Sequence, residues 1–137
     1  ANVEIDALVG RDNDVIFGHT VEELNALRYN YNAFDYYRND ERIRDVMYTF
    51  INGFWTGDVE DFRGIYDELI SKNDEFFVLS DFDSYVKAQE EIERRYNDRH
   101  EWAKMCLVNI AKSGYFSSDR TIDDYAKEIW GLTPFKF

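Results

Sequence analysis

The most informative stretch of the chain is Asn109–Leu132, which reads NIAKSGYFSSDRTIDDYAKEIWGL. Its pattern predicts that one helix closes near Ile110 and that Gly114 stops this helix in the left-handed backbone region, which glycine enters at no steric cost. The Tyr115–Phe116 pair then forms a short apolar link. We therefore expect the end of a helix followed by a buried aromatic turn.

A second helix is expected directly after this turn. The Ser117–Asp119 run offers side-chain oxygens to the free amides of a helix start. Gly131 and Pro134 predict the helix end. Between these signals, apolar residues recur at the spacing of one helical face: Ile122, Tyr125, Ala126, Ile129 and Trp130. The whole stretch predicts a helix–turn–helix corner that buries aromatic side chains.

The first part of the chain, residues 1–30, has the rhythm of a doubly wound α/β unit. A short helix is expected up to Gly10. The apolar run Asp14–Phe17 is bounded by turn formers and predicts a strand. Thr20, with Glu23 at the capping-box position, predicts the start of the next helix. Strand, turn and capped helix are the repeating parts of doubly wound folds.

The remainder, residues 31–137, is expected to be helical. Side chains suited to helix starts stand at Asn39 or Asp40, at Asp58 with Asp61, at Ser80 with Asp83, and at Asp98 with Glu101. Residues expected to face inward from the first two of these helices are Ile43, Val46, Met47, Phe50, Ile51, Phe62, Ile65, Tyr66, Leu69 and Ile70. Phe76–Leu79 is predicted to be a short strand or a buried connector. The chain is thus predicted to be one partial domain, mainly α with one or two short strands.

Composition excludes several classes of partner. The net charge of −12 argues against nucleic acid and against anionic membrane surfaces, because both select clustered Lys and Arg. No apolar run is long enough to span a membrane, and the N-terminus lacks a signal-peptide pattern.

The single cysteine, Cys106, rules out an internal disulfide framework and fits a reducing, cytoplasmic compartment. Because Trp102, Met105 and Ile110 share its predicted helix face, we expect a buried and inert thiol.

Few residues suggest chemistry. His19 and His100 are far apart in sequence and lack metal-ligand spacing, and His19 is expected to cap a turn or face solvent. Arg11–Asp14 has the polarity of a calcium loop without its glycine and terminal glutamate. The Asp119–Arg120 pair is the most site-like polar group, yet its place at a helix start favours capping and a structural ion pair. We therefore expect no catalytic, cofactor-binding or metal-binding residue.

The amino-acid sequence of the chain resembles the C-terminal end of the glycogen and α-glucan (starch, maltodextrin) phosphorylases. The strongest match is the pattern NIAxSGxFSSDRTIxxYAxxIW within Asn109–Trp130. Further matching segments follow the family order: ANVEI at 1–5, YNAFDYY at 31–37, NGFW at 52–55, FFVLSDFDSYVKAQEEIERRYND at 76–98 and EWAKMCLVNI at 101–110. Family members usually have a basic residue at the position of Tyr115. A tyrosine cannot form the ion pair that a basic side chain could form there.

The resemblance implies a much longer parent protein. Such enzymes have two doubly wound (GT-B-like) α/β domains with pyridoxal 5′-phosphate on a lysine between them, and they act as homodimers. They release glucose 1-phosphate from α-1,4-glucan with inorganic phosphate, the cofactor phosphate serving as proton relay. The family's cofactor lysine lies upstream of the segment that resembles ANVEI, and no residue of this sequence matches the lysine, the glucose-binding residues or the phosphate-binding cluster. A first residue of Ala1 rather than Met fits a cut or processed start.

Two hypotheses follow. In the first, the chain is the C-terminal structural piece of a phosphorylase, completes its doubly wound domain, docks on the upstream domains and is inactive alone. In the second, it is a stand-alone helical module whose exposed aromatics bind a partner protein.

Overall fold

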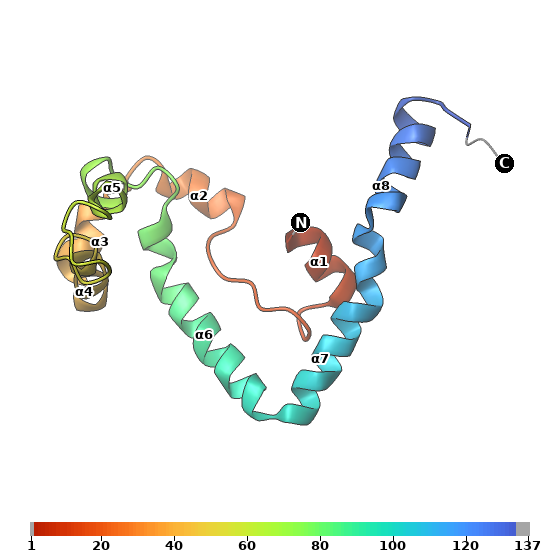
Figure 1. Ribbon diagram of the computed structural model, residues 1–137, viewed down its shortest axis with the longest axis horizontal. Helices are drawn as coiled ribbons and strands as arrows, with labels where there is room; N and C mark the ends of the chain where they lie inside the picture. The colour runs from red at the N-terminus through yellow and green to blue at the C-terminus, as the bar shows by residue number, and fades with distance from the viewer. Residues whose placement is uncertain (1, 134–137) are drawn as a thin grey trace. The chain divides into compact units, whose positions relative to one another are not determined.

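The computed structural model describes residues 2–133, and all regular structure in this range is helical (Figure 1). The chain divides into two compact units. The central unit comprises residues 17–90, and the terminal unit combines residues 1–16 with residues 91–137. Helix α6 (Phe82–Asn97) begins in the first and ends in the second. Each unit is described by itself below.

The central unit holds a hydrophobic core. Its elements are α2 (Val21–Leu27), α3 (Ala33–Asn39), α4 (Glu41–Thr49), α5 (Arg63–Tyr66), the π-helical turn η1 (Asp67–Ser71), the 3-10 turn η2 (Val78–Asp81) and the start of α6. Helix α3 contacts α4, η1 and η2, and Figure 1 shows α3, α4 and α5 grouped together. The buried core residues are Tyr31, Ala33, Ile43, Met47, Phe77 and Leu79. Met47 is only 1% exposed, so the core buries a large side chain almost completely.

Side-chain caps set the helix starts of the central unit. Thr20 and Glu23 form the predicted capping box at α2. Asn32 accepts a hydrogen bond from the Phe34 amide at the start of α3, and Asp40 accepts one from the Arg42 amide at the start of α4. Each cap satisfies an amide that has no partner within its helix.

The terminal unit is built from helices with little buried surface. They are α1 (Asn2–Val9), the end of α6, α7 (Arg99–Lys112), the 3-10 turn η3 (Ser113–Phe116), α8 (Ser118–Asp124) and the π-helical turn η4 (Tyr125–Ile129). Helix α1 contacts α7, and Asn109 on α7 donates to the Asn13 carbonyl at 2.9 Å. Asp98 caps α7 by accepting from the His100 and Glu101 amides, as predicted. Val9 is buried, whereas the apolar residues of α7 and α8 are mostly exposed.

The predicted strand at Asp14–Phe17 is wrong, since this run is an irregular segment. A strand needs a neighbouring strand whose backbone can share its hydrogen bonds, and the described residues contain no strand. The alternative of a buried connector holds for half of Phe76–Leu79. Phe77 is left-handed at φ 61° and η2 follows it; Phe77 and Leu79 are 7% and 6% exposed, whereas Phe76 and Val78 are 79% and 49% exposed.

The predicted succession of helix, turn and helix near the C-terminus forms, but Figure 1 shows α8 continuing nearly in line with α7 and not at a corner. Helix α7 runs two residues past the expected end to Lys112, and Gly114 lies in η3 without a positive φ. A 3-10 turn joins the helices instead of a left-handed stop. Tyr115 and Phe116 are 43% and 44% exposed, so the turn is not buried. Gly131 does end the second helix at φ 61°, whereas Pro134 lies outside the described residues.

Three further expectations fail in detail. The helix expected at Asp58 begins at Arg63, because Asp58 instead accepts from the Glu60 amide in a turn and Asp61 accepts from the Thr56 hydroxyl. The predicted inward residues Val46 and Ile65 are 47% and 42% exposed.

Candidate functional site

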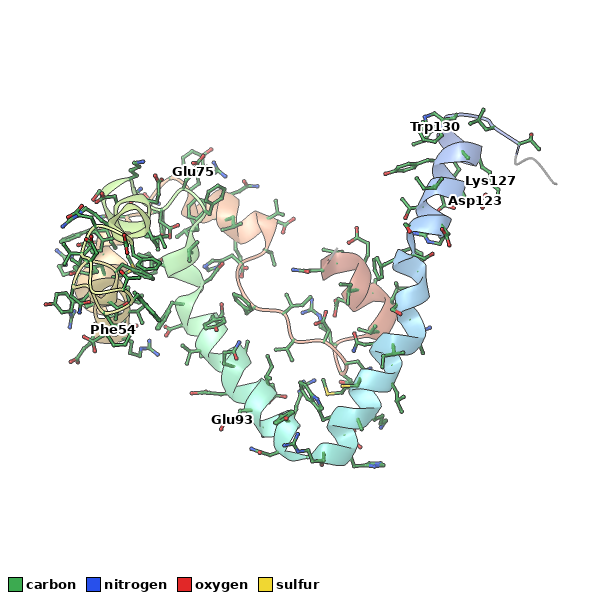
Figure 2. The ribbon with its side chains drawn as sticks, in the orientation of Figure 1. Phe54, Glu75, Glu93, Asp123, Lys127 and Trp130 are labelled. Atoms are coloured by element: carbon green, nitrogen blue, oxygen red, sulfur yellow. The ribbon has the colours of Figure 1, made fainter. Side chains whose placement is uncertain are left out.

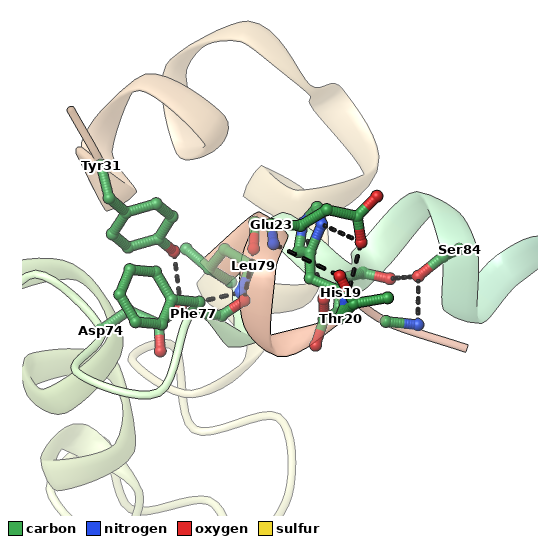
Figure 3. A network of polar contacts seen from close by, with 11 residues as sticks. His19, Thr20, Glu23, Tyr31, Asp74, Phe77, Leu79 and Ser84 are labelled. Atoms are coloured by element: carbon green, nitrogen blue, oxygen red, sulfur yellow. Dashed lines mark hydrogen bonds and ion pairs between the residues drawn. The ribbon is translucent and has the colours of Figure 1, made fainter. Parts of the chain in front are cut away.

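A buried polar network lies at the centre of the central unit. The Asp74 carboxylate is 2% exposed, and its Oδ2 accepts from the Tyr31 hydroxyl at 2.6 Å and from the Leu79 amide at 2.8 Å (Figure 3). Burial, followed by the hydrogen bond to Asp74 and the charge of that carboxylate, raises the pKa of Tyr31 well above its usual value. The phenol therefore remains a neutral donor to a buried acceptor.

The loop that carries Asp74 is held in a left-handed conformation. Asn73, Asp74 and Phe77 have φ values of 66°, 45° and 61°. Asn73 accepts from the Ala33 amide at 2.8 Å and donates to the Tyr31 carbonyl at 3.2 Å. Asn and Asp tolerate this region better than other side chains, whereas a Phe there is a true outlier. The cross-links to Tyr31 and Ala33 hold the strained loop against the start of α3.

A second polar group joins the start of α2 to η2. His19 Nε2 lies 3.7 Å from Asp81 Oδ1, and His19 Nδ1 lies 3.9 Å from Glu23 Oε2 (Figure 3). The Gly18 amide donates to Ser84 Oγ at 3.0 Å. Gly18 is required at this point: its φ is +91°, and a Cβ would come 3.1 Å from Asp81 Oδ2. The His19 ring therefore lies between two carboxylates at the start of α2, while Thr20 and not His19 caps this helix.

Acid is expected to weaken the start of α2. Glu23 Oε2 accepts from the Thr20 amide at 2.7 Å, and this bond, aided by the Thr20 hydroxyl, lowers the pKa of Glu23. Since the folded-state pKa lies below the unfolded one, this contribution is complete above roughly pH 4.3 and disappears as the pH falls through the folded pKa. An NMR titration of the Glu23 carboxyl should show a pKa below the ordinary value of a Glu side chain. A Glu23 carboxyl that titrates at that ordinary value would contradict the cap.

Asp119 and Arg120, the most site-like polar residues of the tail, belong to the structural link between α7 and α8. Ser117 caps α8 by accepting from the Arg120 amide. The Arg120 guanidinium stacks on the Tyr115 ring at 3.8 Å and pairs with Asp124 at 2.6 Å. Arg120 thus takes Asp124, one helical turn on, as its ion partner, and the expected Asp119–Arg120 pair does not form. An aromatic ring at position 115 stacks under a cation, where a basic side chain could not.

The last helical turn carries an exposed ion pair and an exposed indole. Lys127 pairs with Asp123, and Figure 2 labels both beside Trp130. Lys127 and Asp123 side chains are 58% and 44% exposed, which makes this pair a weak contributor to stability.

The remaining residues that the sequence singled out are dispersed. Cys106 is exposed, so the expectation of a buried thiol is wrong; the apolar face of α7 is only partly covered, with Trp102 and Met105 half-buried and Ile110 68% exposed. His100 lies in the first turn of α7. Within Arg11–Asp14, Arg11 pairs with Asp6 at 3.0 Å, and the Asp12 carbonyl accepts from Arg95. Between residues 2 and 133, no three His, Cys, Asp or Glu side chains are grouped as a metal site would require.

Three of the described lysines lack the surroundings that a Schiff-base cofactor needs. A lysine that forms a Schiff base is activated in a desolvated pocket. Lys72, Lys104 and Lys127 instead pair with carboxylates on their own helical turns, and their side chains are 58–66% exposed. No described helix is both long enough and apolar enough to cross a bilayer.

Sequence reasoning missed the Asp74 network. The adjacent turn formers Asn73 and Asp74 were a signal for a sharp turn. Nothing local, however, indicates that Tyr31, far away in the sequence, supplies the buried donor.

Comparison with known proteins gives a consistent result along the whole chain. The sequence model of a family described as carbohydrate phosphorylase matches residues 1–132. The chain is 48% identical over 136 residues to a glycogen phosphorylase of Bacillus subtilis and 42% identical over 138 residues to one of Pasteurella multocida. It is 39% identical over 135 residues to the muscle form of human glycogen phosphorylase. These alignments cover 98–99% of the chain but only 16–17% of each relative.

Proposed function

This chain belongs to the carbohydrate phosphorylase family, and on that premise we propose that it is the C-terminal structural segment of an α-glucan phosphorylase. The observation that carries this proposal is the extent of the match: nearly all of the chain aligns with glycogen phosphorylases, yet it spans only 16–17% of their length. The complete protein would release glucose 1-phosphate from α-1,4-glucan with inorganic phosphate. It would act as a homodimer and bind pyridoxal phosphate outside the described residues.

The role of this segment would be that of a scaffold. Large apolar residues of the terminal unit are exposed: Val3, Leu107, Ile110, Ile122, Ile129, Trp130 and Leu132. Exposed apolar side chains that recur along consecutive helices are suited to cover another part of the same polypeptide. We assign residues 1–30 to the end of a doubly wound unit and residues 31–137 to a helical C-terminal region. Together they would close the C-terminal domain and dock it on the upstream domain.

The proposal predicts that the isolated 137-residue chain is inactive. It should show no pyridoxal absorbance after incubation with the cofactor, and it should release no glucose 1-phosphate from glycogen and phosphate. The complete protein, assayed in parallel, should do both. Glucose 1-phosphate release by the isolated chain, or an inactive complete protein, would overturn the proposal.

A further inference from the structure

The loop between α4 and α5 contains the single Asn–Gly pair of the sequence, Asn52–Gly53. Residues 51–62 form turns and bends without a helix, and Asn52 is exposed. Phe54, which follows the pair, is labelled in Figure 2. Because glycine has no Cβ, the amide nitrogen after Asn52 is not shielded from the Asn52 side chain. The pair therefore sets a side-chain amide beside an open backbone nitrogen.

The fold requires glycine at position 53. Gly53 has a φ of +76°, and a Cβ there would come 3.0 Å from the Gly57 carbonyl oxygen. The Gly57 amide donates to the Gly53 carbonyl at 2.8 Å and closes the loop. A larger residue would be strained both by its backbone conformation and by this close approach. The glycine that leaves the Asn52 side chain open to attack is thus fixed by the loop itself.

The Asn52 side chain is held over the backbone that would attack it. Its Oδ1 accepts a hydrogen bond from the Phe54 amide at 2.9 Å, which closes an Asx turn. The ring of atoms in this turn contains both the Cγ of Asn52 and the amide nitrogen of Gly53. The two atoms that would react are thus held in one small ring before any reaction. The Phe54 N–H also points at Oδ1, the atom on which negative charge develops when a nitrogen attacks Cγ.

The reacting groups have no competing contacts. Among the hydrogen bonds of the described residues, none uses the Gly53 amide or Nδ2 of Asn52. Asn73 and Asn109, by contrast, donate from Nδ2 to backbone carbonyls at 2.9–3.2 Å. Asn25 is exposed but lies within α2, where the backbone is helical. Asn52 thus combines an open nitrogen, a placed carbonyl and a free leaving group.

We propose that Asn52–Gly53 is a site of spontaneous deamidation in the folded protein. Hydroxide removes the proton of the Gly53 amide, and the nitrogen lone pair forms a bond to Asn52 Cγ. The Cγ–Nδ2 bond then breaks, and Nδ2 takes up a proton from water and leaves as ammonia. Water opens the resulting cyclic imide at either carbonyl to give aspartate or isoaspartate. The balance is one water consumed and one ammonia released, without oxidation or reduction.

The conversion changes both the charge and the backbone of the loop. It adds a carboxylate to a segment that already carries Asp58, Glu60 and Asp61. Isoaspartate also routes the backbone through the side-chain carbon, which shifts the register of the hydrogen bond between Gly57 and Gly53. This inference is independent of the proposed function, because it needs only the loop.

The test follows the complete protein over time in mildly alkaline buffer by tryptic peptide mapping, with a zero-time sample to correct for conversion during digestion. Residues 45–63 form one tryptic peptide. Asn52 in this peptide should gain one dalton, with isoaspartate identified by fragmentation. Asn25 is the matched exposed control, and Asn52 should convert at least about tenfold faster, equivalent to a difference of about 1.4 kcal/mol in barrier. N52D already carries a product side chain and keeps an acceptor for the Phe54 amide, so it should fold and its peptide should gain no mass.

A comparison with the urea-unfolded complete protein tests the Asx turn. The Phe54 donor is in place only in the folded loop, so Asn52 should convert at least as fast in the native protein as in the unfolded one. Slower conversion in the native protein, an Asn25 that converts as fast as Asn52, or a mass gain in the N52D peptide would each overturn the site.

Discussion

Replacing Asp74 with alanine should destabilise the central unit by about 4 kcal/mol. The substitution leaves two buried donors, the Tyr31 hydroxyl and the Leu79 amide, without their acceptor. Each orphaned donor costs about 1–3 kcal/mol. Alanine must also occupy the left-handed backbone at φ 45°, which costs about 1–2 kcal/mol for an ordinary residue. The expected loss is a large fraction of the total stability of a domain.

The Leu79 amide is the direct probe of this effect. Hydrogen exchange of the peptide containing Leu79 should accelerate by about 10² or more in D74A. D74N keeps one side-chain oxygen and tolerates the left-handed backbone, so its effect should be clearly smaller. Asp45 on α4 is exposed and provides the control: D45A should change stability by less than about 0.5 kcal/mol. A D74A protein whose Leu79 amide exchanges at the wild-type rate would refute the network as a stabilising element.

The elements that sequence reasoning predicted correctly are those fixed by neighbouring residues. Thr20 with Glu23, Asp40 and Asp98 each cap the helix that follows, because a cap needs only an oxygen within about three residues of a free amide. Gly131 ends the last helix for an equally local reason.

The predictions that were wrong depend on which other part of the chain packs against a helix or pairs with a strand. Asp14–Phe17 has the composition of a strand but no described neighbour to pair with. Helix α7 has an apolar pattern that predicts a buried Cys106, yet its apolar face is only partly covered and Cys106 is exposed. Periodicity indicates which face is apolar, and it does not indicate what covers that face.

The candidate site shows the same division. That His19 lies beside a helix start was foreseeable from its position before Thr20. Its contact with Asp81, and the contact of Tyr31 with Asp74, depend on how the turn at Asn73 and the turn η2 fold back on α2 and α3. A single sequence carries no record of such pairings.

The last prediction tests whether upstream polypeptide covers the tail. Trp130 is 57% exposed and contacts Tyr125 at a ring distance of 6.0 Å. In the isolated chain, W130A should therefore change the stability of the tail by less than about 0.5 kcal/mol. In the complete protein, the Trp130 indole would be buried against the upstream domain. W130A should then lower the free energy of unfolding by about 3–5 kcal/mol. The same substitution should thus have two very different effects.

Hydrogen exchange of the peptide spanning residues 118–132 separates these outcomes. W130A should accelerate its exchange by about 10² or more in the complete protein and by less than about threefold in the isolated chain. Tyr29, which is 87% exposed on the central unit, is the matched aromatic control, and Y29A should have a small effect in both settings. Because an intrinsic contribution of Trp130 to its own helix would act equally in both proteins, only docking on another part of the polypeptide produces the difference. Equal exchange rates in the two settings would mean that the apolar face of α8 and η4 remains exposed in the complete protein, and the scaffold role proposed for the tail would have to be abandoned.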